Sequence, residues 1–410
     1  MVGSDGLLVG SVGTSDYAEV TYELDGQTVR SAVSPVALAE LCDIESALIF
    51  RTPEAGCEND WRLKEAFAGA GVDFECVDIG LVTDRADVDD ILHTVVAGIR
   101  SSRFAEDSIV LDISHSFRSL PIVFLLSVMQ LTSLEEDVTL EKIYYSRFAG
   151  SDDHDTSPVI DLTYLRTMIE WYDAFEMAAE AGTYREVRVL LEERRDEIFR
   201  NDVSNPERVD FSRAIGQFEA AQREIDAGFP LEAGVNAKRA LDSISALDES
   251  AFVGPEGMVL EPLEQLLAGF DTDQEVDDKA ELVLDEAELR RQADIVQFYV
   301  DHERYWIAIE CARELLVNRF LYDAGLTDAW LDRDNRELIT PAPGDKHDQF
   351  THDVEAVQDL WDRIREARNT YAHAGFKRSE RHAGDDIERW LTTLCDLIDD
   401  DAFWRERGEC

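Results

Sequence analysis

Three residues near the end of the chain have the types and spacing needed to act on a phosphodiester: Arg368, Asn369 and His373, in the stretch R-N-T-Y-A-H. The apolar spacing around them predicts a helix over residues 354–374, on which Asn369 and His373 are four residues apart and share a face. A planar guanidinium binds phosphate oxygens, and an imidazole transfers protons near neutral pH. The alternative is an ordinary helix C-terminus, where cations offset the helix dipole.

The charge around this stretch is opposite to that of the whole chain. The sequence has 39 Lys and Arg against 88 Asp and Glu, a formal net charge of −49. Between residues 363 and 382, in contrast, two acids (Glu366 and Glu380) are outnumbered by the cations Arg363, Arg365, Arg368, Lys377, Arg378 and Arg381. A basic segment in so acidic a protein predicts an anionic binding partner.

The composition predicts a globular protein with two or three domains, because 410 residues that are 45% hydrophobic can form more than one core. The acidic excess is spread over the whole chain and only six basic residues are Lys, a pattern typical of proteins from salt-loving archaea. A localised acidic tail would instead indicate an interaction protein. Six cysteines without a C-x-x-C pair indicate reduced thiols.

The sequence predicts no membrane association and a cytoplasmic location. The first residues, M-V-G-S-D-G, lack the basic segment of a signal peptide. The longest apolar run, residues 120–131, is too short to span a bilayer.

The first part of the chain, residues 7–165, alternates between short apolar runs and helical stretches. Strands are expected at residues 7–9, 19–24, 27–29, 47–50, 72–79, 108–113 and 140–145, and helices at 35–42, 61–70, 88–103 and 120–131. Asp25-Gly26 is typical of a tight hairpin turn. Strands separated by helices of this length predict a doubly wound, parallel α/β sheet.

Two loops follow strands of this sheet, where ligands of such folds bind. The first is G-T-S-D-Y, residues 13–17, and the second is D-I-S-H-S-F-R-S-L-P, residues 112–121. The second loop leads into a helix, with hydroxyl residues, His115 and Arg118, which predicts an anion site. Helix capping is the alternative for either loop alone. The chain has neither G-x-G-x-x-G nor G-x-x-x-x-G-K-[ST], which argues against a dinucleotide cofactor or ATP held by a P-loop.

The rest of the chain is expected to be helical, as a connector over residues 166–276 and a terminal bundle over 277–410. The strongest helical segment, residues 287–322, carries an aromatic stripe that includes Tyr299, Tyr305 and Trp306. Such a stripe is typical of a core, and a base-stacking platform is the alternative. His347 and His352 lie among aspartates, but their spacing matches no common metal site, so no metal is expected.

These motifs together resemble a known family. D-I-S-H-S-F-R resembles the D-x-[ST]-H-G-F-R signature of CARF domains, the Rossmann-like sensors of CRISPR-associated proteins, and G-T-S-D-Y resembles their first ligand loop. R-N-T-Y-A-H is similar to the R-x4-6-H motif of HEPN domains, the helical ribonuclease modules found in the same chains. The resemblance covers residues 1–165 and about 280–410, in the order sensor, helical linker and nuclease.

The resemblance implies a type III CRISPR accessory ribonuclease that acts as a homodimer. Two sensor domains would bind cyclic oligoadenylate, with cyclic tetra-adenylate favoured, and two helical domains would form one composite site for single-stranded RNA. The implied ligand residues are Gly13, Thr14, Ser15, Asp16, Tyr17, Asp112, Ser114, His115, Ser116 and Arg118. The implied catalytic residues are Arg368, Asn369 and His373, and the implied RNA contacts are Arg365, Lys377 and Arg378.

Family chemistry needs no cofactor or metal: a ribose 2′-OH attacks the adjacent phosphate and leaves a 2′,3′-cyclic phosphate. Two departures from the signature are Ser116 in place of the usual Gly, and Ser114 in place of a common Thr. They bear on ligand affinity and ring size more than on the binding mode. Two alternatives stay open at this point: a sensor whose helical domain no longer cleaves RNA, and a sensor crevice that degrades its own cyclic ligand.

Overall fold

The computed structural model describes residues 6–14, 17–104, 107–115, 119–147, 156–200, 204–247, 255–339, 354–373 and 384–404. The chain divides into two compact units, Met1–Thr167 and Met168–Cys410, and the boundary falls inside helix α5 (Tyr164–Ala181). Each unit is described by itself. The expected division of the helical part at residue 276 stays a prediction.

The first unit is built on an eight-stranded sheet with the order β3-β2-β8-β7-β6-β1-β4-β5. The strands are β1 (Gly6–Val12), β2 (Val20–Leu24), β3 (Gln27–Ser31), β4 (Ser46–Arg51), β5 (Asp73–Asp78), β6 (Ser108–Asp112), β7 (Thr139–Ser146) and β8 (Thr156–Asp161). The five strands from β7 to β5 are parallel to one another, as predicted. The sheet is mixed beyond them, because β7–β8 and β2–β3 are antiparallel pairs.

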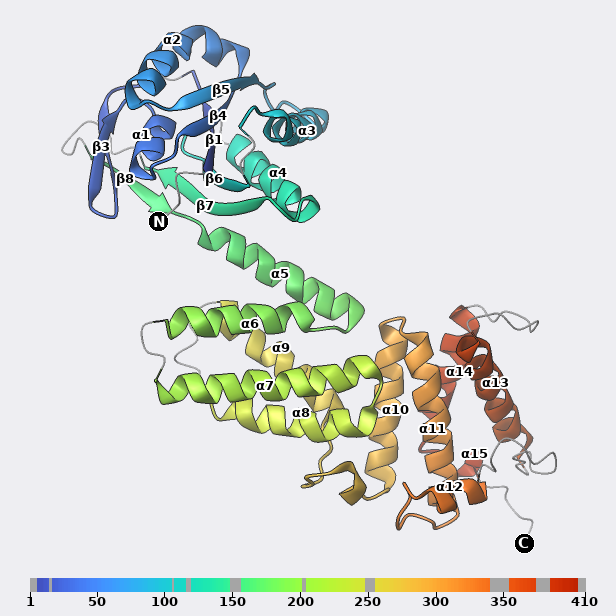
Figure 1. The fold of residues 1–410 in the computed structure, drawn as a ribbon. Helices are drawn as coiled ribbons and strands as arrows, with labels where there is room; N and C mark the ends of the chain where they lie inside the picture. The colour runs from blue at the N-terminus through green and yellow to red at the C-terminus, as the bar shows by residue number, and fades with distance from the viewer. Residues whose placement is uncertain are drawn as a thin grey trace. The chain divides into compact units, whose positions relative to one another are not determined.

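Helices cover both faces of this sheet, which confirms the doubly wound α/β prediction (Figure 1). They are α1 (Ser34–Leu41), α2 (Pro53–Ala70), α3 (Arg85–Ser101) and α4 (Leu120–Leu134). The first two share one apolar core with the sheet, and the last two share another. Strands buried on both faces, such as β1 with all seven residues buried, explain the continuous apolar runs in the sequence.

The strand order places β1 between β4 and β6. After β1 the chain forms the β2–β3 hairpin at the far edge of the sheet and returns to β4 and β5 on one side of β1. It then crosses to β6 and β7 on the other side of β1. The order therefore reverses between β1 and β6, and ligands of open α/β sheets bind in the crevice outside the carboxyl ends of the strands at such a point. The two predicted loops follow β1 and β6, so both lie at this crevice.

The second unit is helical in its described residues. Its helices after α5 are α6 (Arg185–Ile198), α7 (Pro206–Ala227), α8 (Pro230–Ser245), α9 (Pro255–Phe270), α10 (Glu286–Asp301), α11 (Tyr305–Asp323), α12 (Arg333–Ile339), α13 (Glu355–Ala372), α14 (Gly384–Leu397) and α15 (Asp401–Trp404), with a short 3₁₀ turn, η2 (Lys279–Glu281). One buried apolar cluster extends from Trp171 to Trp404. The expected segment 287–322 is two helices, because Glu303 with φ 54° breaks it between α10 and α11.

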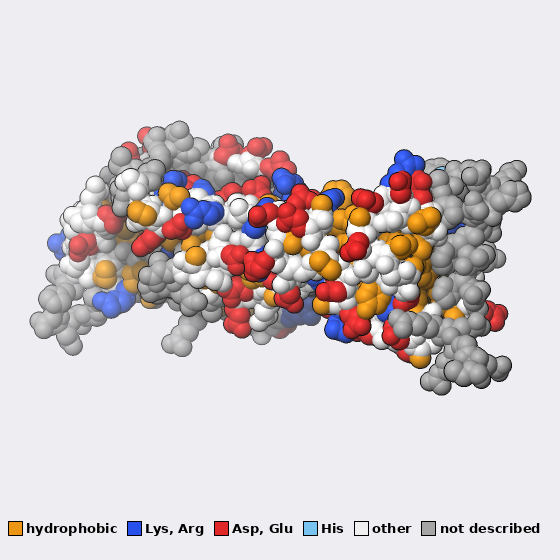
Figure 2. All heavy atoms as spheres, turned by 90° about the horizontal axis from the view of Figure 1, so that it is seen from below, with side chains coloured by type: hydrophobic (Ala, Val, Ile, Leu, Met, Phe, Trp, Pro, Cys, Tyr) orange, Lys and Arg blue, Asp and Glu red, His pale blue; other side chains and the backbone are white. Residues whose placement is uncertain are grey.

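The surface carries the acidic excess in a scattered form. Figure 2 shows Asp and Glu side chains spread over the visible face, with Lys and Arg side chains placed among them. In the described part of the chain, none of the helices combines the length and the apolar character that crossing a bilayer requires.

Candidate functional site

The structure brings the described members of both predicted loops to the carboxyl edge of β1 and β6. Gly13, Thr14 and Tyr17 follow β1, while Asp112 ends β6 and Ser114 and His115 follow it. Four predicted ligand residues (Ser15, Asp16, Ser116 and Arg118) lie outside the described residues.

Asp112 is the buried anchor of the second loop. Its side chain is fully buried, and its Oδ1 accepts hydrogen bonds from the Ser114 backbone N–H at 2.9 Å and from the Ser114 hydroxyl. Burial raises the pKa of Asp112 to about 6, although the hydrogen bonds from Ser114 act in the opposite direction. The buried Asp112 carboxyl therefore fixes the backbone of the second loop and is shielded from solvent.

A chain of hydroxyl groups ends on this carboxyl. Because Ser114 donates to Asp112, its Oγ is the acceptor for the Ser34 hydroxyl at 3.1 Å and for the Ser146 N–H at 2.7 Å. Ser34 and Ser146 are joined through their own hydroxyls at 2.7 Å. Sequence reasoning missed these two residues. Their positions in the chain could have indicated them: Ser34 begins α1 and Ser146 ends β7, so both lie at the same edge of the sheet as the two loops.

His115 is held as a neutral ring. Its Nε2 accepts the Ser34 backbone N–H at 3.1 Å, so Nδ1 carries the ring hydrogen, and its backbone carbonyl accepts the Ser11 hydroxyl at 2.5 Å. Burial lowers the pKa of His115 to about 4. At neutral pH this ring is therefore a hydrogen-bond donor and an aromatic surface, and it carries no charge.

Tyr17 connects the first loop to the second. Its ring lies 4.6 Å from the His115 ring, centroid to centroid, at an interplanar angle of 55°. Its hydroxyl accepts the Gly13 backbone N–H at 2.7 Å, and burial raises its pKa. The two loops thus place adjoining aromatic rings next to a network of hydroxyl groups, an arrangement that suits an aromatic, polar ligand.

The three residues predicted to be catalytic lie together at the C-terminal end of α13. Arg368 and Asn369 are half-buried in its last turn, and His373 is the exposed residue that ends the helix, with its backbone N–H donating to the Asn369 carbonyl at 3.3 Å. An exposed imidazole can exchange protons with a bound phosphodiester, and a guanidinium in the preceding turn can bind its phosphate.

Glu310 on α11 holds the Arg368 side chain, and sequence reasoning missed it. The Arg368 Nε donates to Glu310 Oε1 at 3.0 Å. Both side chains are partly exposed, so the pair contributes well under about 1 kcal/mol to stability. Its geometry matters more, because a carboxylate bound through Nε leaves the two terminal nitrogens of the guanidinium for a phosphate. Among the side-chain hydrogen bonds and ion pairs between described residues, this is the one that Arg368 makes.

The described arginines of the basic segment each contact a group of the chain itself. Arg365, a predicted RNA contact, pairs with Asp362 on its own helix at 2.9 Å. Arg363 lies over the Trp390 ring, 5.5 Å from its centroid. Lys377 and Arg378, the other predicted RNA contacts, lie outside the described residues.

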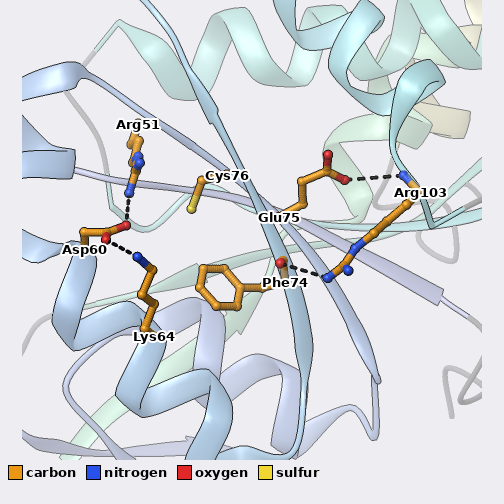
Figure 3. Close-up of a pocket in the computed structure, with 7 residues that line it drawn as sticks. All are labelled: Arg51, Asp60, Lys64, Phe74, Glu75, Cys76 and Arg103. Carbon is orange, nitrogen blue, oxygen red and sulfur yellow. Dashed lines mark hydrogen bonds and ion pairs between the residues drawn. The ribbon is translucent and has the colours of Figure 1, made fainter.

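A separate pocket of about 460 Å³ opens on β5, at one edge of the sheet (Figure 3). Its three cations are paired with three acids: Asp60 binds both Arg51 and Lys64 at 2.5 Å, Asp78 binds Arg51 at 3.1 Å, and Asp73 lies 3.8 Å from Arg103. Because local acids match these cations, the pocket has no excess positive charge for an anionic ligand.

No group of three or more His, Cys, Asp or Glu side chains is arranged to hold a metal within the described ranges. His347 and His352, the histidines weighed as metal ligands, lie outside them.

Comparisons with known proteins give little further information. No protein-family model matches the chain, and no curated protein matches it. One similar solved structure is that of Csm6 from Enterococcus italicus bound to cyclic hexa-2′-fluoro-hexa-dAMP, with 10% identity over 96% of this chain and 92% of that one, and a TM-score of 0.37. A TM-score this low does not assign a family, so the functional argument rests on the residues themselves.

Proposed function

We propose that this protein is a CARF–HEPN ribonuclease: an endoribonuclease for single-stranded RNA that cyclic oligoadenylate activates in CRISPR antiviral defence. The observation that carries the proposal is the placement of two motifs in one chain. The D-I-S-H loop lies at the point where the strand order reverses, and the R-N-T-Y-A-H segment ends a helix of the other unit. Either motif alone has an ordinary structural explanation.

In the sensor crevice, His115 and Tyr17 are the described residues best suited to contact the ligand. Their adjoining rings offer surfaces on which adenine can stack, and the neutral His115 Nδ1–H can donate a hydrogen bond. Asp112 and Ser114 act differently, because their polar atoms bind each other and Ser34. We assign these two as positioning residues that fix the loop.

In the nuclease site, each group has one role in an attack by the ribose 2′-OH on the adjacent phosphate. His373 transfers a proton, Arg368 stabilises the negative charge that develops on the phosphorus-bound oxygens, and Asn369 orients the phosphate. Glu310 orients Arg368. The 2′-OH loses a proton and the leaving 5′-oxygen gains one, so a single His373 would have to serve twice. A second protomer supplies a second His373.

The homodimer has a candidate surface in the sensor unit. Helix α4, which follows the D-I-S-H loop, exposes Ile122 (63%) and Leu126 (51%), four residues apart on one face. Exposed apolar residues clustered in this way are typical of protein interfaces. Pairing there would bring two sensor crevices into one assembly, as a symmetric cyclic ligand requires.

The test is RNA cleavage by the full-length protein in high potassium chloride with EDTA, with and without cyclic tetra-adenylate. Cleavage only with the ligand, with 2′,3′-cyclic phosphate products and loss in His373→Ala and Arg368→Ala, is the expected result. Arg389→Ala is the matched control, because Arg389 is an exposed arginine paired on α14. Absence of cleavage with both tetra- and hexa-adenylate would overturn the proposal in favour of a silent sensor. Consumption of the cyclic ligand by a His373→Ala variant would assign a second activity to the crevice.

A further inference from the structure

Two large aromatic side chains lie exposed beside the candidate nuclease site. Trp306 on α11 is 42% exposed and Tyr371 on α13 is 36% exposed. Their ring centroids are 6.3 Å apart and their planes differ by 26°. Neither belongs to the buried apolar cluster of this unit, whereas Tyr299 of the same aromatic stripe is fully buried in it. Core packing therefore accounts for Tyr299 but leaves Trp306 and Tyr371 without a role.

The aromatic pair and the Arg368–Glu310 pair connect the same two helices. Trp306 precedes Glu310 by four residues on α11, and Tyr371 follows Arg368 by three on α13, so each aromatic shares a face with its charged neighbour. At about 1.5 Å rise per residue, the rings lie about 4.5 to 6 Å along the helices from the ion pair. That offset is under two nucleotide steps of about 3.4 Å.

The surroundings favour a small planar ligand over a protein surface. In the described residues of α11 and α13, Trp306 and Tyr371 are the only large apolar side chains that are exposed. A protein interface would need an apolar patch around them. Near-parallel rings at the surface are, in contrast, what a base requires, because every base can stack on an aromatic face whatever its sequence.

We propose that Trp306 and Tyr371 form a nucleobase-binding subsite that stacks an unpaired base of the RNA next to the phosphate bound by Arg368. This inference rests on the proposed ribonuclease function and adds to it the contact that positions the substrate. Stacking accepts every base, so the subsite selects single-stranded over paired RNA, whose bases are already stacked on each other.

The experiment measures equilibrium binding of a fluorescent 2′-O-methyl RNA 12-mer, which lacks the attacking 2′-hydroxyl, to the full-length protein in potassium chloride with cyclic tetra-adenylate. Trp306→Ala and Tyr371→Ala are expected to weaken binding roughly tenfold each. Trp306→Phe and Tyr371→Phe keep a ring and are expected to bind within about threefold of the wild type.

A second set of oligonucleotides identifies the contact as a base. For a series of 12-mers with one abasic position moved along the strand, wild-type binding is expected to fall at one or two positions. Trp306→Ala is expected to show no further loss with those oligonucleotides. Unfolding temperature and sedimentation of every variant accompany the binding measurements.

Three results would overturn the inference. If Trp306→Ala lowers the unfolding temperature and leaves RNA affinity unchanged, the aromatic pair only joins α11 to α13. If it converts a dimer to a monomer and weakens intact and abasic RNA equally, the occupant is a second copy of the chain. If the variants bind RNA normally while the wild type cleaves it, the subsite alone is wrong. Failure of the wild type to bind or cleave RNA at all would instead refute the ribonuclease function.

Discussion

Replacing Asp112 by Asn is expected to change how the stability of the sheet unit depends on pH. Burial raises the pKa of Asp112 to about 6, above the ordinary value of about 3.9. Between these two values the folded protein holds a proton that the unfolded chain releases, so this contribution to stability grows as the pH falls. From pH 7 to pH 5 the gain is about 1.4 kcal/mol. Asn has the shape of the protonated carboxyl but does not titrate, so the variant lacks this increase in stability at low pH.

His115 contributes with the opposite sign in the same pH range. Burial lowers its pKa to about 4, below the ordinary value of about 6.5. Its contribution is fully present above about pH 6.5 and is lost as the pH falls toward 4, about 2 kcal/mol of it between pH 7 and pH 5. In the wild type the two contributions largely offset each other. The Asp112→Asn variant is therefore expected to lose about 2 kcal/mol over this range, and His115→Gln to gain about 1.4 kcal/mol.

Hydrogen exchange of peptides from β1 and β6, corrected for the intrinsic pH dependence of exchange, measures these changes as opening free energies. Relative to the wild type, Asp112→Asn should lose about tenfold in protection between pH 7 and pH 5, because 1.4 kcal/mol is a factor of about ten. Peptides from α10 and α11 serve as the internal control and should not respond. An Asp112→Asn variant with the same pH dependence as the wild type would refute the assignment of Asp112 as a buried, proton-binding anchor.

Three further predictions concern the two sites and the proposed interface. Glu310→Ala is expected to lower kcat for RNA cleavage about tenfold. Glu310→Gln is expected to keep most of the activity, because an amide oxygen still accepts the Arg368 Nε–H. Equal losses of kcat for the two variants in steady-state kinetics would contradict a positioning role. Tyr17→Phe removes the hydroxyl that accepts the Gly13 N–H and is expected to weaken cyclic tetra-adenylate binding about fivefold by calorimetry. An unchanged affinity would show that this hydrogen bond does not position the ligand loop. Ile122→Glu is expected to shift sedimentation from dimer to monomer, and an unchanged mass would exclude α4 as the interface.

The sequence predicted the sheet unit well where local signals are strong. Apolar runs located the five parallel strands, and Asp25-Gly26 located the hairpin, where both residues have positive φ. Strand β8 was missed because it contains Pro158, which has no backbone N–H to donate and argues against a strand. Helix α2 begins eight residues before the expected start, and its signal was readable: Thr52 caps the helix by accepting the Ala55 N–H at 3.3 Å.

The candidate sites show what local signals cannot supply. The motifs identified Ser114 and Arg368, but the groups that hold them come from distant parts of the chain. Ser34 and Glu310 are separated from their partners by 80 and 58 residues, respectively, and neither belongs to a motif. The state of a site residue depends on such contacts. A sequence can indicate that His115 lies in a ligand loop, but its neutral form follows from burial and from the backbone N–H that its Nε2 accepts.

The same argument applies to charge. A count over the basic segment predicts a field that attracts RNA, yet the described arginines of that segment each contact a group of the chain itself: Asp362, Trp390 or Glu310. In concentrated salt a field would be screened within about 3 Å in any case. Binding of a phosphate must then depend on contact geometry. In the proposed nuclease site Arg368 would meet that requirement, because Glu310 binds the guanidinium through Nε and leaves its two terminal nitrogens facing away from the carboxylate.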